Sequence, residues 1–104
     1  MSIFMADETF AIDITETKDE KGRTVYEIVE GGPYVLRTLK SREDSMLRNS
    51  EGDRKAFAAL EILPSIVVAG LKKDDFPRLK SYIAEIMVME AHRRSHLTEA
   101  DRGN

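Results

Sequence analysis

The feature that most constrains the fold is a change of periodicity at Gly31-Gly32-Pro33. Before this point, apolar residues alternate with polar ones, as in a strand with one buried face. After it, apolar residues recur three and four positions apart, as in amphipathic helices. The sequence therefore predicts an α+β fold, in which an N-terminal β-hairpin or small antiparallel sheet is followed by about three helices.

Two alternating runs, residues 10–15 and 24–30, predict the first strands. The first run places three apolar side chains on one face: Phe10, Ile12 and Ile14. A charged turn at residues 18–23 connects the runs and predicts a β-hairpin. Because two strands alone are only marginally stable in water, we expect the extended segment at residues 33–39 to join them.

The segments that follow are predicted to be helical. The first helix covers residues 41–49, where the Ser41 hydroxyl can cap the first turn and nearby acids favour the positive end of the helix dipole. Residues 50–53 interrupt this helix, and Asp53 can cap a second one. The second helix carries its apolar residues near one face: Phe57, Leu60, Leu63, Val67 and Leu71.

Pro64 disturbs the second helix. Proline removes the backbone hydrogen bond to the Leu60 carbonyl, and its ring clashes with the preceding turn. We expect a kinked helix that ends at Gly70; the alternative is a break followed by a strand through residues 65–69. The sequence leaves open whether residues 66–69 are helix or strand.

Two adjacent acids, Asp74 and Asp75, precede the last apolar stripe. A carboxylate at a helix start accepts N–H groups that have no partner within the helix, and Pro77 in the first turn loses no hydrogen bond. We interpret these acids as a helix cap. A catalytic pair would also need a third group and a water-excluding pocket, so no catalytic residue is predicted. The stripe itself consists of Phe76, Leu79, Ile83, Ile86 and Met87.

His92 and His96 lie four residues apart, which places both imidazoles on the same side of a helix. The zincin pattern needs a glutamate directly after the first histidine, but this chain has Arg93 there, and it has no cysteine to complete a metal site. We therefore predict a solvated helix end at these residues, with no metal and no cofactor.

The charge pattern argues against nucleic acid as a partner, and the lack of a long apolar stretch argues against a membrane. The formal net charge is −3, and the basic residues are interleaved with acidic ones instead of forming a stripe that could bind phosphates. The longest nearly uncharged stretch, residues 62–71, is about half of the ~20 residues that span a bilayer.

The chain length of 104 residues predicts a single domain with one modest core. The absence of cysteine fits a reducing compartment, so we expect the cytoplasm. We divide the domain 1–104 into a disordered N-terminus (1–8), a β-rich part (10–39), a helical part (41–95) and a polar tail (96–104).

The last helix is unusually apolar, since residues 82–89 place hydrophobic side chains most of the way around it. Two compatible explanations apply: the helix lies centrally between sheet and helices, or one face packs against another copy or a partner. Methionine side chains are adaptable and suit such a surface. The candidate partner-binding residues are Ile83, Ile86, Met87, Met89, Arg93 and Arg94.

The order of these segments resembles that of the tail assembly chaperones of long-tailed bacteriophages. The resemblance covers residues 10–92. It consists of a β-rich piece leading through Tyr34-Val35-Leu36-Arg37-Thr38-Leu39, a short helix at Ser41-Arg42-Glu43-Asp44, a helical segment ending Val68-Ala69-Gly70-Leu71, acids at Asp74-Asp75 and a last amphipathic helix. Pro64 departs from this layout.

The resemblance implies a non-enzymatic protein in the cytoplasm of a bacterial host. Such a protein binds the tape measure protein, helps to recruit the tail tube protein and self-associates into a homo-oligomer. In that family a longer frameshifted form is often made as well, and an extension would follow residues 97–104. The alternative is a small adaptor, a secretion-type chaperone or an antitoxin-like interaction protein.

Overall fold

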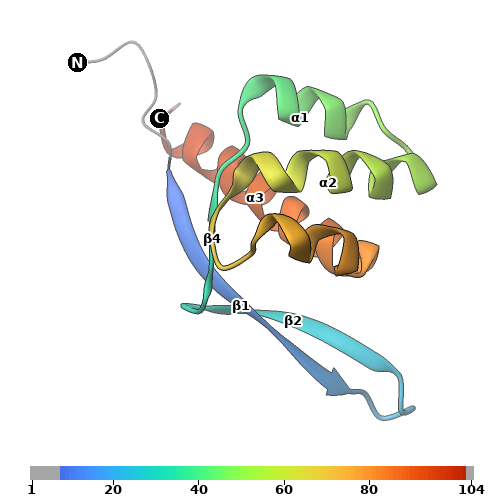
Figure 1. The fold of residues 1–104 in the computed structure, drawn as a ribbon. Helices are drawn as coiled ribbons and strands as arrows, with labels where there is room; N and C mark the ends of the chain where they lie inside the picture. Colours follow the sequence, from blue (N-terminus) through green and yellow to red (C-terminus); the bar gives the residue numbers. More distant parts are fainter. Residues whose placement is uncertain (1–7, 103–104) are drawn as a thin grey trace.

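The computed structural model describes the backbone of residues 8–102 and the side chains of residues 8–96. The predicted α+β class is confirmed, with an antiparallel sheet packed against helices (Figure 1). In chain order the elements are β1 (Thr9–Lys18), β2 (Thr24–Glu30), β3 (Tyr34–Arg37), α1 (Ser41–Arg48), α2 (Asp53–Ile66), β4 (Val67–Ala69), the 3₁₀ helix η1 (Lys73–Arg78) and α3 (Ser81–Arg102).

The sheet has the strand order β2-β1-β3-β4, and all of its pairings are antiparallel. Ile12 of β1 lies opposite Glu30 of β2 and Tyr34 of β3, so β1 is central. The helices lie on one side of the sheet, and the far end of the β1–β2 hairpin projects beyond them (Figure 1). The predicted hairpin and third strand are therefore confirmed.

The hydrophobic core lies between the sheet and the helices. Its completely buried members include Ile12 and Leu36 from the sheet, and Leu47 from α1. The other contributions come from Leu39 before α1, from α2 (Ala59, Ile62, Leu63 and Ile66) and from α3 (Ala84, Met87, Val88 and Ala91). Because α3 contributes four buried residues spaced three or four apart, it is a central helix of the fold.

The second helix ends at Ile66 and β4 follows at once, so the expected kinked helix to Gly70 is wrong. The strand alternative is correct for residues 67–69, whereas Ser65 and Ile66 are helical. Pro64 lies in the last helical turn, where a break in the backbone hydrogen bonding coincides with the end of the helix. Gly52, and not Asp53, is the N-cap residue. The predicted face is also partly wrong, because Phe57 is 66% exposed while the small residues Ala58 and Ala59 are buried.

The predicted position of the first helix is confirmed, but its predicted cap is wrong. Ser41 lies inside α1, and Lys40 is the N-cap residue. The Glu43 carboxylate accepts the Lys40 N–H at 2.9 Å, as the glutamate of a capping box does. Two hydrogen bonds of 2.7 Å from the Arg37 guanidinium hold the same carboxylate, so it joins β3 to α1.

This arrangement predicts a pH dependence of stability. Burial alone would raise the pKa of Glu43, but hydrogen bonds from Arg37 and from the Lys40 N–H lower it below the usual 4.5. Because the pKa is lowered in the folded state, the stabilisation is fully present above about pH 4.5 and is lost as pH falls through the folded-state pKa. We expect Glu43→Gln to cost about 1 kcal/mol at neutral pH.

Urea unfolding between about pH 7 and about pH 3 measures this effect. The difference in unfolding free energy between the wild type and Glu43→Gln should shrink as the pH falls. The exposed Glu20 in the hairpin turn provides the control, since Glu20→Gln should leave a small difference at every pH. A Glu43→Gln difference that stays constant with pH would contradict the role of this ion pair.

The prediction that Asp74 or Asp75 caps the last helix is wrong, because both lie in the first turn of η1, whose N-cap residue is Lys72. Asp75 accepts the Lys72 N–H at 2.8 Å in the first turn of η1, while Asp74 is exposed. The residues from Phe76 onward therefore do not form one helix, because η1 ends before α3 begins at Ser81. The helix then continues to Arg102, so most of the predicted polar tail is helical. Residues 1–7 of the predicted disordered N-terminus lie outside the described residues.

Candidate functional site

A groove of about 800 Å³ follows the outer side of α3 beside strand β2. We call it the α3 groove. Its lining comes from one strand residue and from successive turns of α3: Ile28, Tyr82, Glu85, Ile86, Met89, Glu90, His92, Arg93 and His96. The groove exists because α3 is apolar on more sides than the sheet and α2 can cover.

The floor of the α3 groove is apolar. Ile28, Ile86 and Met89 are half-buried, so each still presents part of its side chain. Tyr82 is 57% exposed, and its ring lies 5.5 Å from the ring of Tyr26 at an angle of 53°. This tilted contact is a favourable geometry for aromatic rings and fixes Tyr82 at the β2 side of the groove.

The rim of the α3 groove is charged. Arg93 donates its Nε–H to Glu90 at 3.1 Å, and a second, short contact joins the same two groups. Hydrogen bonds from Arg93 and then Arg94 lower the pKa of Glu90, although partial burial opposes them. Glu90 is therefore an anion in neutral solution. Charges of both signs accordingly lie beside the apolar floor.

Arg94 holds α3 against the sheet. Its guanidinium lies 4.3 Å from the centre of the Phe10 ring, a cation–π contact, and it forms ion pairs with Glu30 and Glu90. The Arg94 side chain is only 20% exposed. Its role is thus to position α3, which differs from the partner-binding role predicted for it.

The structure divides the other predicted partner-binding residues among three places. Ile86, Met89 and Arg93 line the α3 groove. Met87 is 1% exposed and belongs to the core, so the prediction that it forms a binding surface is wrong. Ile83 is half-buried and packs against the core beside a smaller hollow of about 320 Å³.

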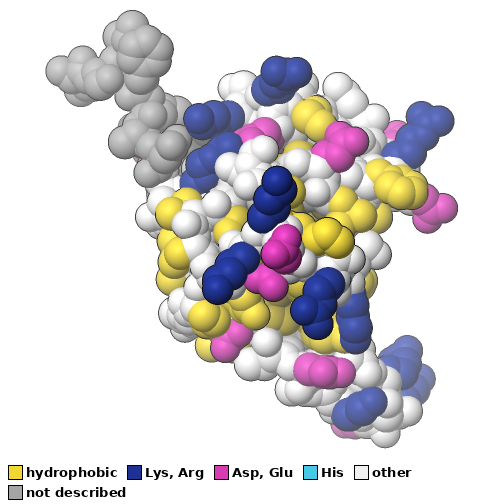
Figure 2. Space-filling view, in the orientation of Figure 1, with side chains coloured by type: hydrophobic (Ala, Val, Ile, Leu, Met, Phe, Trp, Pro, Cys, Tyr) yellow, Lys and Arg dark blue, Asp and Glu magenta, His cyan; other side chains and the backbone are white. Residues whose placement is uncertain are grey.

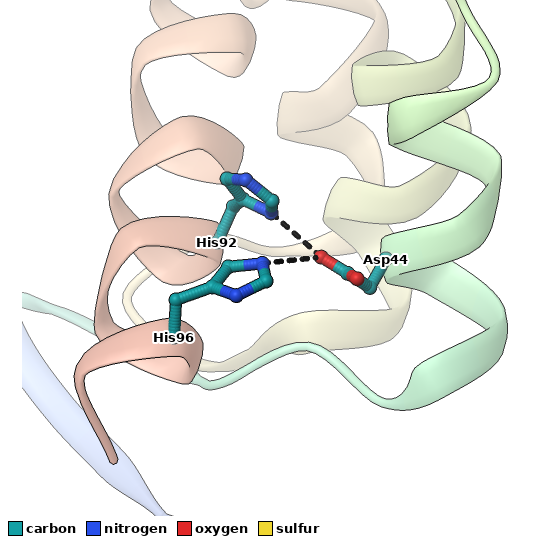
Figure 3. Close-up of side chains that lie close together, drawn as sticks. All are labelled: Asp44, His92 and His96. Atoms are coloured by element: carbon teal, nitrogen blue, oxygen red, sulfur yellow. Dashed lines mark hydrogen bonds and ion pairs between the residues drawn. The ribbon is translucent and has the colours of Figure 1, made fainter. Parts of the chain in front are cut away.

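A second constellation lies at one end of the groove, where α3 faces α1. The Asp44 Oδ1 atom lies 2.7 Å from Nδ1 of His92 and 3.2 Å from Nε2 of His96 (Figure 3). We call these three residues the histidine cluster. The two imidazole rings meet edge to face, with their centres 4.4 Å apart. The prediction of a solvated helix end is therefore wrong for His92, whose side chain is 22% exposed.

No family model matches this chain, and neither a curated protein nor a solved structure matches it. Its function is therefore inferred from the groove and the histidine cluster. The face drawn in Figure 2 carries hydrophobic side chains interspersed with Lys, Arg, Asp and Glu, without a large area of one sign. Among the described residues, no helix combines the length and the apolarity that crossing a bilayer requires.

Sequence reasoning missed five residues of these sites: Ile28, Tyr82, Glu85, Glu90 and Asp44. Ile28 and Tyr82 lie on the groove because β2 runs beside α3, and no local pattern indicates that pairing. Asp44 lies 48 residues before His92, on a different helix. The spacing of the two histidines was the signal that could have led to the cluster, but the carboxylate that completes it is brought there only by tertiary packing.

Proposed function

We propose that this protein is a non-enzymatic assembly chaperone whose α3 groove holds the apolar face of an amphipathic client helix. The observation that carries the proposal is the apolar floor bordered by Glu85, Glu90 and Arg93. An amphipathic helix has the same arrangement, with an apolar stripe bordered by charged residues. The residue resemblance to tail assembly chaperones supports the tape measure protein as the client.

The dimensions of the α3 groove suit such an occupant. From Tyr82 to His96, α3 rises about 1.5 Å per residue, so the lined part is about 21 Å long, which corresponds to about four turns of a client helix. Met89 supplies an unbranched, polarisable side chain that adapts to different apolar residues. Such adaptability suits a chaperone, because its client offers several related segments instead of one fixed epitope.

The resemblance adds three further parts to the proposal. It supports recruitment of the tail tube protein and self-association of this chain. It also supports a cytoplasmic site of action in a bacterial host. Each of these parts can be tested separately from client binding.

Co-expression with the tape measure protein from the same genome tests the groove directly. Ile86→Glu places a carboxylate on the apolar floor and should reduce the soluble client recovered with this chain by about tenfold, the effect of losing roughly 1.4 kcal/mol of binding free energy. Phe57→Glu makes the same kind of change on α2, outside the groove, and should leave recovery unchanged. Circular dichroism of each variant verifies its helical content.

Two results would contradict the groove as the client site. One is full recovery of soluble client with a folded Ile86→Glu variant. The other is loss of recovery with Phe57→Glu alone, which would place the client on α2. If the wild-type chain does not solubilise the client at all, a small adaptor or antitoxin-like protein becomes the better proposal.

A further inference from the structure

We propose that the histidine cluster is a binding site for a divalent transition metal ion, with Zn²⁺ as the best match. Asp44 of α1 and the histidines of α3 offer three ligand atoms that all lie within 4.8 Å of one another (Figure 3). The site goes beyond the proposed chaperone function and does not depend on it.

The donor set fits zinc. Two imidazole nitrogens and one carboxylate oxygen are ligands that Zn²⁺ accepts, and the i, i+4 spacing on α3 presents both imidazoles on one side of the helix. Ca²⁺ and Mg²⁺ prefer sites built from oxygen atoms, so they fit less well. Three protein ligands leave a fourth tetrahedral position for water or for a donor from a partner.

The two distances from the Asp44 carboxylate are close to those of an assembled site. Around a tetrahedral ion with bonds of about 2.0 Å, neighbouring ligand atoms lie about 3.3 Å apart. The two contacts of the Asp44 Oδ1 atom measure 2.7 Å to His92 and 3.2 Å to His96. The two imidazole nitrogens lie within 4.8 Å of each other. Binding of the ion would therefore require His92 to move about half an ångström from Oδ1 and the two imidazoles to approach each other by up to about 1.5 Å.

Neighbouring side chains orient the Asp44 carboxylate toward the proposed metal site. Arg48 donates from Nε to the other oxygen of Asp44, Oδ2, at 2.9 Å. This ion pair fixes the orientation of the carboxylate and leaves Oδ1 directed at the histidines. Outer contacts of this kind commonly orient metal ligands. The nearby cation Arg93 is paired with Glu90, which offsets its repulsion of a metal ion.

A bound ion would connect α1 to α3. His92 and His96 also line the α3 groove, so the ion would lie at the end of that groove. Because the ion binds the folded arrangement of two helices that are far apart in the sequence, it should raise the thermal stability of the protein.

Calorimetric titration of the tag-free, metal-stripped full chain with Zn²⁺ tests the proposal. We expect saturable binding of one ion per chain and an increase in melting temperature. His96→Ala removes a ligand whose side chain is 43% exposed, so this variant should fold, and its affinity for Zn²⁺ should fall at least about tenfold. Asp44→Asn should have the same effect, whereas Asp53→Asn, at the exposed start of α2, should bind as the wild type does.

The absence of saturable Zn²⁺ binding by the wild type would overturn the proposal. Equal affinities of the wild type, His96→Ala and Asp44→Asn would also overturn it, because the ion would then bind elsewhere. In that case the cluster is a hydrogen-bonded contact between α1 and α3 only. Recovery of soluble tape measure protein is also measured in the presence of a chelator. The chaperone proposal predicts unchanged recovery, so failure of the metal proposal can be distinguished from failure of the chaperone proposal.

Discussion

Replacing Met87 with glutamate is expected to cost about 4 kcal/mol of folding free energy, a large share of the roughly 5–15 kcal/mol that stabilises a typical domain. Met87 is 1% exposed and lies in the core between the sheet and α2. A carboxylate there loses most of its hydration, so it must either unfold the protein or take up a proton at a similar cost.

Met89→Glu is the matched control, because it introduces the same side chain two residues further along α3. Met89 is half-buried on the groove, so its carboxylate can remain hydrated. Urea unfolding followed by circular dichroism should show a stable Met89→Glu variant and a strongly destabilised Met87→Glu variant. Equal stabilities of the two variants would contradict the orientation of α3 and, with it, the location of the α3 groove.

Gly70→Ala is expected to cost about 4 kcal/mol, because two effects combine at this position. Gly70 has φ +99°, a conformation that side-chain-bearing residues rarely adopt. A Cβ atom added there would also lie 2.2 Å from the Pro33 carbonyl oxygen and 2.9 Å from the Tyr34 Cα. These contacts are with backbone, which cannot move aside without disturbing the pairing of β3 with β4.

Gly22→Ala separates the two effects. Gly22 has a similar φ of +77°, but an added Cβ would meet nothing within 4 Å. The unfolding free energy of this variant should therefore fall only by the cost of its backbone conformation, about 1 kcal/mol. The unfolding free energies of both variants can be compared by urea titration. If Gly70→Ala and Gly22→Ala lower the unfolding free energy equally, the close approach of Gly70 to Pro33 does not constrain the fold as the structure implies.

Local patterns were sufficient to predict most of the fold. Alternation identifies β1 and β2 because each strand buries one face, and the turn between them is stabilised by Asp19, whose carboxylate accepts the Lys21 and Arg23 N–H groups. The end of α2 was harder to predict. Pro64 indicated a disturbance there, but β4 forms because Val67 can pair with Leu36 of β3, a partner distant in sequence.

The candidate sites were predictable only in part, for a geometric reason. The hydrophobic excess of α3 correctly indicated uncovered apolar surface, and Ile86, Met89 and Arg93 are found on it. The sequence did not show which side of α3 faces the core. Met87 and Met89 are about 200° apart around the helix axis, so tertiary packing buries one and leaves the other accessible. Asp44 was not predicted for the same reason.

The central claim is that this chain binds and solubilises a client. The most direct measurement is light scattering of the complex purified after co-expression of the wild-type chain with the tape measure protein from the same genome. The chaperone proposal predicts soluble client in a discrete complex with several copies of this chain. Insoluble client, together with a chain that elutes alone at its monomer mass of 11.8 kDa, would contradict the proposal.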